Sequence, residues 1–281
     1  MPGKKLIVTH IFPDLDAITS VWLLQRFDSA WEDAGTEFVA AGQTWQGEAV
    51  DSDPDAVHVD TGLGRFDHHQ LTGRTCAAKL VLEWLLEEKK IPEKYRESLR
   101  RLIEVVTQVD NFEDCYWPEA TNDRYDLGLP QLFDYLKLSS KLNDKELVSQ
   151  GILLLDAVLF GLTEKARAEA DIKAGIQFES VYGRCLGLLS QQSWPVKLAQ
   201  KMGYALVVKK EPRTNLVAIK CQPKPELDLT KLYEALKKAD PAANWYFHQS
   251  KHIILNGSRH NPMVKPSRLS LEELIEIIKS I

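Results

Sequence analysis

Short apolar runs alternate with longer amphipathic stretches over roughly the first 110 residues of the chain. Apolar runs of a few residues are typical of buried strands, whereas apolar residues spaced three and four apart mark one face of a helix. The pattern predicts strands at 6–8, 37–41 and 56–60 and helices at 15–31, 76–88 and 92–109. This order is typical of an α/β domain with a mostly parallel sheet, in which ligands bind at the carboxyl ends of the strands.

The pattern changes after residue 130. Residues 131–174 have helical spacing, with Ile152 and Leu159 on one apolar face. Pairs of apolar runs separated by turn residues then follow, together with two short helical stretches, and they predict a second α/β domain. We therefore expect a domain at 1–130, a helical connector at 131–174 and a smaller C-terminal domain at 175–281.

Charge is distributed unevenly along the chain. The 281 residues carry 35 Lys and Arg and 40 Asp and Glu, a net charge of −5. Residues 203–281 hold 13 basic and 8 acidic side chains, and residues 1–202 hold 22 basic and 32 acidic ones. The chain as a whole is therefore not a basic nucleic-acid coat. An acidic front and a basic back instead indicate two domains with different tasks.

Cysteine spacing and apolar runs indicate the cellular setting. The cysteines are far apart and form no C-x-x-C pair; they are Cys76, Cys115, Cys185 and Cys221. This spacing favours reduced thiols in the core of a cytosolic protein. The N-terminus lacks the apolar segment of a signal peptide, and the longest apolar run, 152–162, is too short to span a bilayer. We expect a cytoplasmic protein without a membrane partner.

Side chains that can ligate metals gather at the ends of the predicted elements. They follow the first strand, the third strand and the last helix of the first domain, and they are His10, Asp14, Asp16, Asp60, Asp67, His68, His69 and Asp110. A mixture of imidazole and carboxylate ligands suits Mn, Fe or Zn better than Ca, and it can hold two ions if one carboxylate bridges them. Crowded carboxylates repel one another, and divalent cations offset that charge.

Each of these residues also has a structural interpretation. Asp14 or Asp16 alone would be a helix N-cap, and Asp110 could simply end a helix. Two adjacent histidines on a surface turn often have no special role. His58 lies on the same strand face as Asp60, and it is best interpreted as a buried histidine with its hydrogen bonds satisfied. The combined order and spacing favour a metal site.

Two segments resemble the motifs of a known family. "HIFPDLDAITS" at residues 10–20 resembles H-x-x-P-D-x-D-A-x-x-S, the first motif of the DHH phosphoesterase superfamily, and "FDHHQ" at 66–70 resembles its name-giving motif. That superfamily includes RecJ-like exonucleases, oligoribonucleases and family II pyrophosphatases. "FDHHQ" also resembles the MYG1 exonuclease family. The resemblance covers roughly residues 1–110, and it implies an N-terminal DHH-type metal-binding catalytic domain and a DHHA1-like substrate-binding domain at the C-terminus.

The resemblance also implies a role for each candidate residue. Two divalent ions are expected, Mn²⁺ in the first place and Mg²⁺ as the alternative. One would be held by His10, Asp14 and Asp60, and the other by Asp16, Asp60, His68 and Asp110, with Asp60 as the bridge. The two catalytic residues would be His69, which faces the substrate phosphate, and Asp67, which orients a neighbouring side chain.

The expected chemistry is hydrolysis of a phosphoester. Two ions lower the pKa of a shared water, and the resulting hydroxide attacks phosphorus without a serine or cysteine nucleophile. The sequence contains no G-x-x-x-x-G-K, which excludes a P-loop NTPase.

The C-terminal part offers a candidate substrate clamp. Exonuclease-type members of the superfamily carry a G-G-G-H-like loop, and residues 256–260, "NGSRH", match it in part. A functional interpretation makes Ser258, Arg259 and His260 a phosphate or nucleotide clamp. The alternative is an ordinary Asn-Gly turn with solvated charges.

These inferences lead to one expected function and two alternatives. We expect a metal-dependent phosphodiesterase that hydrolyses short single-stranded nucleic acid or small nucleotides. The first alternative is a pyrophosphatase or nucleotide phosphatase on the same site. The second is a degenerate family member that binds nucleotides without hydrolysing them. The sequence leaves open a homodimer and the choice between RNA and DNA.

Overall fold

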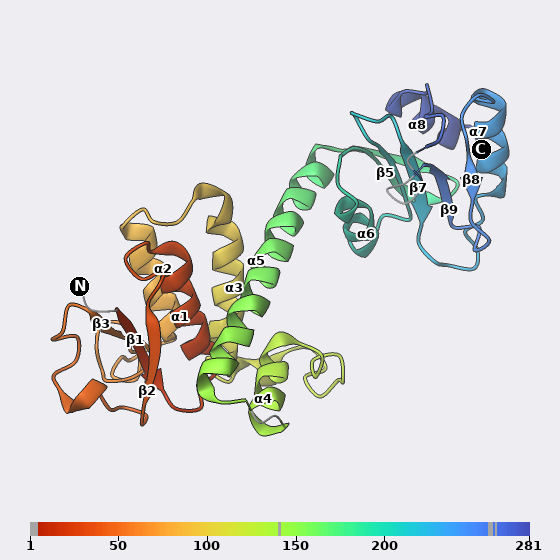
Figure 1. Ribbon diagram of the computed structural model, residues 1–281. Coiled ribbons are helices and arrows are strands. Elements are labelled where there is room, and N and C mark those ends of the chain that lie inside the picture. Colours follow the sequence, from red (N-terminus) through yellow and green to blue (C-terminus); the bar gives the residue numbers. More distant parts are fainter. Residues whose placement is uncertain (1–4, 140–141, 258–260, 262) are drawn as a thin grey trace. The chain divides into compact units, whose positions relative to one another are not determined.

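The computed structural model describes residues 5–139, 142–257, 261 and 263–281 (Figure 1). The chain forms two compact units, Met1–Thr163 and Glu164–Ile281, and the boundary lies inside one long helix. The predicted division at 130 and 174 stays a prediction. Each unit is described in turn.

A three-stranded parallel sheet forms the centre of the first unit. Its strands are β1 (Leu6–His10), β2 (Gly35–Val39) and β3 (Ala56–His58), in the order β2-β1-β3. Leu6 is paired with both Gly35 and Ala56. Because all three strands run the same way, the carboxyl ends of β1 and β3 meet at one edge of the sheet.

Helices supply most of the core of the first unit. The α-helices are α1 (Leu15–Phe27), α2 (Ala77–Glu87), α3 (Glu93–Asp110), α4 (Leu129–Ser139) and α5 (Asp144–Ala174), with 3₁₀ turns η1 (Trp45–Gly47) and η2 (Glu113–Tyr116). Ile7 on β1 and Val57 on β3 are buried in one cluster with Trp22, Leu85 and Leu155 from three of these helices. Leu99 and Ile103 of α3 belong to the same cluster, so the helices and the sheet share one core that holds their ends in place.

Helix α5 is longer than the apolar run from which it was expected. Its 31 residues include an 18-residue stretch with a mean hydropathy of 1.5, so by length and composition it could cross a membrane. The run 152–162 alone is shorter than this stretch, because the helix continues on both sides of it. Leu155 and Leu159 are buried in the core of the first unit, and Asp156 accepts a hydrogen bond from Trp22 Nε1 at 3.1 Å.

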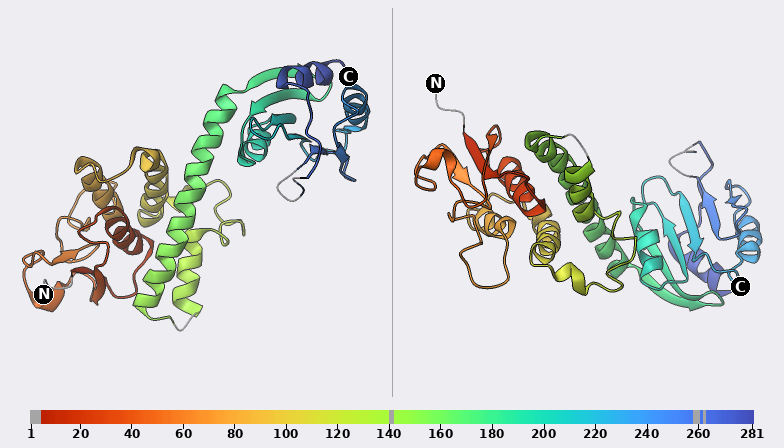
Figure 2. Two further views of the ribbon diagram at one scale, coloured as in Figure 1. Left: turned by 45° about the horizontal axis from the view of Figure 1, so that its top comes forward. Right: turned by 90° about the horizontal axis from the view of Figure 1, so that it is seen from below.

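The second unit is a six-stranded mixed sheet covered by helices (Figure 2). Its strands are β4 (Ile176–Ser180), β5 (Gly183–Leu189), β6 (Leu206–Lys210), β7 (Val217–Cys221), β8 (Tyr246–Phe247) and β9 (Ile253–Asn256), in the order β4-β5-β6-β7-β9-β8. The pair β5–β6 is parallel and the other neighbours are antiparallel. The helices are α6 (Trp194–Lys201), α7 (Thr230–Ala239) and α8 (Leu271–Lys279).

The predicted α/β fold class is confirmed, including the parallel sheet of the first unit. The sequence pattern missed α6 and β8, because eight and two residues are too few to establish a period. The expectation that all four cysteines are core thiols was wrong for one of them. Cys76 and the two cysteines of the second unit are buried, but Cys115 in η2 is exposed, because the short turn η2 has no buried residue.

Candidate metal centre

The first group of candidate ligands lies at the carboxyl edge of the parallel sheet. His10 is the last residue of β1, and Asp60 follows β3 by two residues. His10 Nε2 lies 3.3 Å from Asp60 Oδ2 and 4.0 Å from Asp14 Oδ2. Asp14 is also the N-cap of α1, where its side chain accepts a hydrogen bond from Ala17 N at 3.0 Å. The structural and ligand interpretations of Asp14 are therefore compatible, since one carboxylate oxygen can cap the helix while the other faces His10.

Asp16 is held in place by another helix. Its buried carboxylate accepts hydrogen bonds from the backbone N–H groups of Ala77 and Ala78, at 2.7 and 2.8 Å, in the first turn of α2. The N-terminus of a helix favours a negative charge, so these donors stabilise the carboxylate and fix its orientation. Sequence reasoning missed these two residues, because backbone N–H donors leave no signature in residue type.

The second group converges on one imidazole. His68 Nε2 lies 3.3 Å from Asp60 Oδ1, 3.6 Å from Asp110 Oδ2 and 3.8 Å from Asp16 Oδ2. Asp110 is the last residue of α3, so strand, loop and helix ends all contribute to this group. Three sets of side chains have ligand atoms within 4.8 Å of one another, and they are His10, Asp14, Asp60; Asp16, His68, Asp110; and Asp60, His68, His69.

Asp60 lies between the two groups. One of its oxygens faces His10 and the other faces His68. Its Oδ1 atom is buried and, among the described residues, accepts no hydrogen bond. An unsatisfied buried carboxylate oxygen is unfavourable, and a bound cation would satisfy it. Asp60 also has a left-handed backbone, with φ of +54°, a conformation that Asp tolerates better than most residues. The residues present therefore fit two divalent ions that share Asp60.

Electrostatics show that the cluster binds protons when cations do not balance it. Burial raises the pKa of Asp16, and the charges of Asp60 and Asp110 raise it further. Burial likewise raises the pKa of Asp110 to about 6. The neighbouring Asp60 raises the pKa of His68 to about 9. For His10, burial acts in the opposite direction, but Asp60 and other acceptors outweigh it and raise the pKa to about 9. Metal ions would displace these protons.

The remaining histidine of the "FDHHQ" motif is held by the aspartate of the same motif. His69 Nδ1 lies 2.7 Å from Oδ1 of the buried Asp67, which also accepts a hydrogen bond from His69 N at 3.0 Å. The other oxygen, Asp67 Oδ2, accepts a hydrogen bond from Leu63 N at 2.7 Å. Asp67 thus fixes the loop between β3 and the motif, and its contact with Nδ1 leaves Nε2 of the exposed His69 ring to meet a ligand.

His58 has the satisfied, buried environment expected of a structural histidine. Its Nδ1 lies 2.9 Å from Asp51 Oδ1, and its Nε2 accepts a hydrogen bond from Trp45 N at 3.0 Å. These contacts tie β3 to the loop that precedes it.

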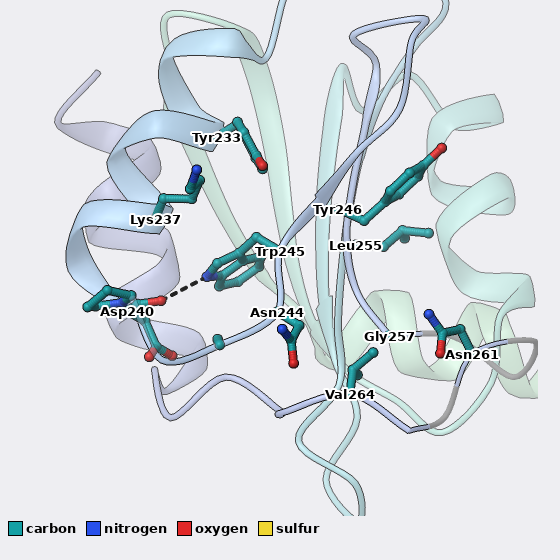
Figure 3. A pocket seen from close by; sticks show the side chains of 12 residues that line it. Tyr233, Lys237, Asp240, Asn244, Trp245, Tyr246, Leu255, Gly257, Asn261 and Val264 are labelled. Atoms are coloured by element: carbon teal, nitrogen blue, oxygen red, sulfur yellow. Dashed lines mark hydrogen bonds between the residues drawn. The ribbon is translucent and has the colours of Figure 1, made fainter.

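The predicted clamp, Ser258, Arg259 and His260, lies outside the described residues. Gly257 and Asn261 flank it and line a pocket of about 540 Å³ in the second unit (Figure 3). Figure 3 shows Trp245 in this pocket, where its Nε1 donates a hydrogen bond to Asp240 O at 3.2 Å.

Comparison with known proteins was made at three levels. No family model and no curated protein matches the chain. Three solved structures each cover 99% of it. One is the DHH domain of a member of a family of ribosomal proteins, at 12% identity, 86% coverage of that chain and a TM-score of 0.34. The second is an exopolyphosphatase-related protein from Bacteroides fragilis, at 12% identity, 91% coverage of that chain and a TM-score of 0.28. The third is the exonuclease RecJ bound to manganese, at 13% identity, 90% coverage of that chain and a TM-score of 0.28.

One of these three solved structures is described as a DHH domain. The two sequence motifs and the arrangement of their side chains in the first unit are what indicate a function for this chain.

Proposed function

We propose that the chain is a DHH-type, two-metal phosphoesterase that hydrolyses phosphodiester bonds in short single-stranded oligonucleotides or small nucleotides. One observation carries the proposal. The buried carboxylate of Asp60 has one oxygen 3.3 Å from His10 Nε2 and the other 3.3 Å from His68 Nε2, and further carboxylates lie beside each imidazole. This is the arrangement that a carboxylate bridging two ions requires.

The ligand set divides into two groups around that bridge. His10 and Asp14 would hold one ion with Asp60, and Asp16, His68 and Asp110 would hold the other. Two divalent ions, Mn²⁺ or Mg²⁺, would supply a water of lowered pKa and offset negative charge on the phosphate.

The protein residues around the ions have their own tasks. The N–H groups of Ala77 and Ala78 keep the carboxylate of Asp16 oriented, so that this ligand is fixed before substrate binds. Asp67 holds His69 through Nδ1, and the opposite ring atom can donate a hydrogen bond to a non-bridging phosphate oxygen.

The proposed preference for short substrates follows from charge. Residues 1–202 hold 22 basic and 32 acidic side chains, and this stretch includes the whole metal centre. A long polyanion gains affinity from many phosphate contacts with basic residues, which an acidic surface does not offer. A short substrate needs only the ions at the scissile phosphate and a few further contacts.

The test is a Mn²⁺-dependent activity panel on the purified protein. It compares a dinucleotide, a pentamer, a 20-mer, a nucleoside monophosphate and pyrophosphate, before and after EDTA treatment and with Mn²⁺ added back. We expect hydrolysis of the dinucleotide and pentamer that EDTA abolishes and Mn²⁺ restores. The variant Asp60→Asn should lose most of its activity, whereas Asp33→Asn, at an exposed carboxylate, should keep full activity.

Other outcomes of the panel would replace the proposal. Turnover of pyrophosphate alone would make the protein a pyrophosphatase. Mn²⁺ binding without turnover of any substrate would make it a nucleotide-binding protein with an inactive centre.

A further inference from the structure

Three apolar residues near the candidate ligands have an unfavourable backbone conformation. Of the ten described non-glycine residues with positive φ, the large apolar ones are Phe12, Leu63 and Phe112, with φ of +54°, +58° and +57°. They follow the ligands at the ends of β1, β3 and α3 by two or three residues. All three side chains are also exposed, by 70%, 56% and 77%. Both the conformation and the exposure are unfavourable for a large apolar residue, so their coincidence at three ligand-bearing segments points to a common use.

Hydrogen bonds to the surrounding structure hold these segments in place. Phe12 N donates to Asp144 Oδ2 at 3.3 Å, and Leu63 N donates to Asp67 Oδ2 at 2.7 Å. Phe112 follows the C-cap of α3, a position where helices usually place Gly or Asn, because these residues adopt left-handed angles more readily. A phenylalanine at this position does not stabilise the helix end, so its presence needs another reason.

Chain connectivity keeps all three residues near the centre. His10 and Asp60 are 3.3 Å apart, and Asp110 is 3.6 Å from His68, which also contacts Asp60. A residue two or three positions beyond a ligand has its Cα within about 7–11 Å of the ligand's Cα, so each of the three begins close to the candidate ion sites. The groups attached to a phosphate that binds the ions would therefore lie close to these side chains.

We propose that Phe12 and Phe112, with Leu63 beside them, form an apolar rim on which a nucleobase of the substrate stacks next to the scissile phosphate. Every nucleobase has a π-face that stacks on an aromatic ring, whereas inorganic phosphates have no apolar surface to bury there. This inference rests on the proposed function and narrows it: the substrate class is nucleobase-bearing phosphodiesters, and the rim selects them without reading sequence.

The first test measures binding of two ligands in Mn²⁺ by calorimetry. One is a dinucleotide whose scissile oxygen is replaced by methylene, so that it cannot be hydrolysed, and the other is the same molecule without its bases. The wild-type protein should bind the base-bearing ligand about tenfold more tightly. Phe12→Ala and Phe112→Ala should each lose most of this preference. Equal affinity of the wild-type protein for the two ligands would overturn the proposal.

Two further variants separate the ring from other causes. Phe12→Asn keeps a residue that tolerates the left-handed backbone but removes the ring, so it should lose the preference as Phe12→Ala does. A wild-type preference in Phe12→Asn would assign the effect to the backbone and reject the rim. Phe160→Ala removes an equally exposed phenylalanine from α5 and should keep the preference.

Turnover is measured separately from binding. Hydrolysis of the natural dinucleotide and of its base-free counterpart with equal kcat/KM would leave the phosphoesterase function standing and reject the rim. Absence of any turnover, together with a preference that the two alanine variants lose, would reject the phosphoesterase function and keep the rim as a nucleobase-binding surface.

Discussion

Oδ1 of the buried Asp67 lies 2.7 Å from Nδ1 of His69, while His68, the adjacent residue, directs Nε2 at carboxylates. Both histidines lie within 4 Å of Asp60 Oδ1, at 3.3 Å for His68 and 3.8 Å for His69, but their nearest partners differ. One is oriented by a single aspartate that contacts no other imidazole in the described part of the chain, and the other faces three candidate ligands. The two side chains can therefore be tested separately.

His68→Ala should lower the affinity for Mn²⁺ by at least about tenfold, because it removes a ligand. His69→Ala should keep both ions and lower kcat by roughly a hundredfold, because its expected contact is with the phosphate. Metal content by mass spectrometry and kcat from the same preparations decide between them. Equal loss of metal in both variants would mean that the roles are wrongly assigned.

Asp60→Asn should lower turnover by roughly two orders of magnitude and reduce metal occupancy, because the amide keeps the shape but not the charge that both ions would share. Circular dichroism should show an intact fold, since the carboxylate oxygen at issue accepts no hydrogen bond from the described residues. A variant that retained two ions and normal turnover would contradict the bridging role.

Mn²⁺ binding should release protons and strengthen with pH. The free imidazoles of His10 and His68 have pKa values of about 9, so below that pH an incoming ion must displace their protons. Affinity should rise by about tenfold per pH unit for each displaced proton and level off above pH 9. Calorimetry at about pH 7 in two buffers of different ionisation enthalpy counts the protons. His68→Ala should release fewer of them, and an affinity that is constant between pH 6 and 9 would contradict the assignment.

Two glycines in α5 should respond oppositely to the same substitution. A Cβ on Gly151 would collide with Ile18 Cγ2 and lie 3.0 Å from Phe133 Cε1, so Gly151→Ala should destabilise the protein by about 1–3 kcal/mol. Gly161 has nothing within 4 Å of that position, and Gly161→Ala should stabilise it by about 0.5–1 kcal/mol. Urea denaturation of both variants measures the two changes. Stabilisation by both would show that helix propensity outweighs the close packing of α5 on α1, and destabilisation by both would contradict the expected gain at Gly161.

The sequence predicted the site best where a residue type that ligates metals lies at the end of a recognisable strand or helix. His10 and Asp60 could be placed together because the ends of parallel strands share an edge, and the strands were recognisable from their apolar runs. The partners of Asp16 could not be found in this way, since Ala77 and Ala78 contribute only backbone. The strained backbone at Phe12 was equally hidden, because the fold, and not the residue type, imposes it.

Long-range features of the fold were also beyond the sequence pattern. Helical spacing was recognised over 131–174, but the division of this stretch into α4 and α5 was not predicted. The two-residue strand β8 exists because β9 offers it hydrogen-bonding partners. Pairing of this kind depends on residues distant in the sequence and leaves no local period.

Helix α5 belongs to both compact units, since Leu155 and Leu159 lie in the core of the first and Ile172 lies in the core of the second. A recombination or proteolytic cut at residue 130 would take α5 from the first core, and a cut at residue 174 would take Ile172 from the second. Neither unit is therefore a module that can be exchanged between proteins at the loops that flank this helix. An exchange that keeps both cores would have to join two chains within the helix itself, in register, near Thr163.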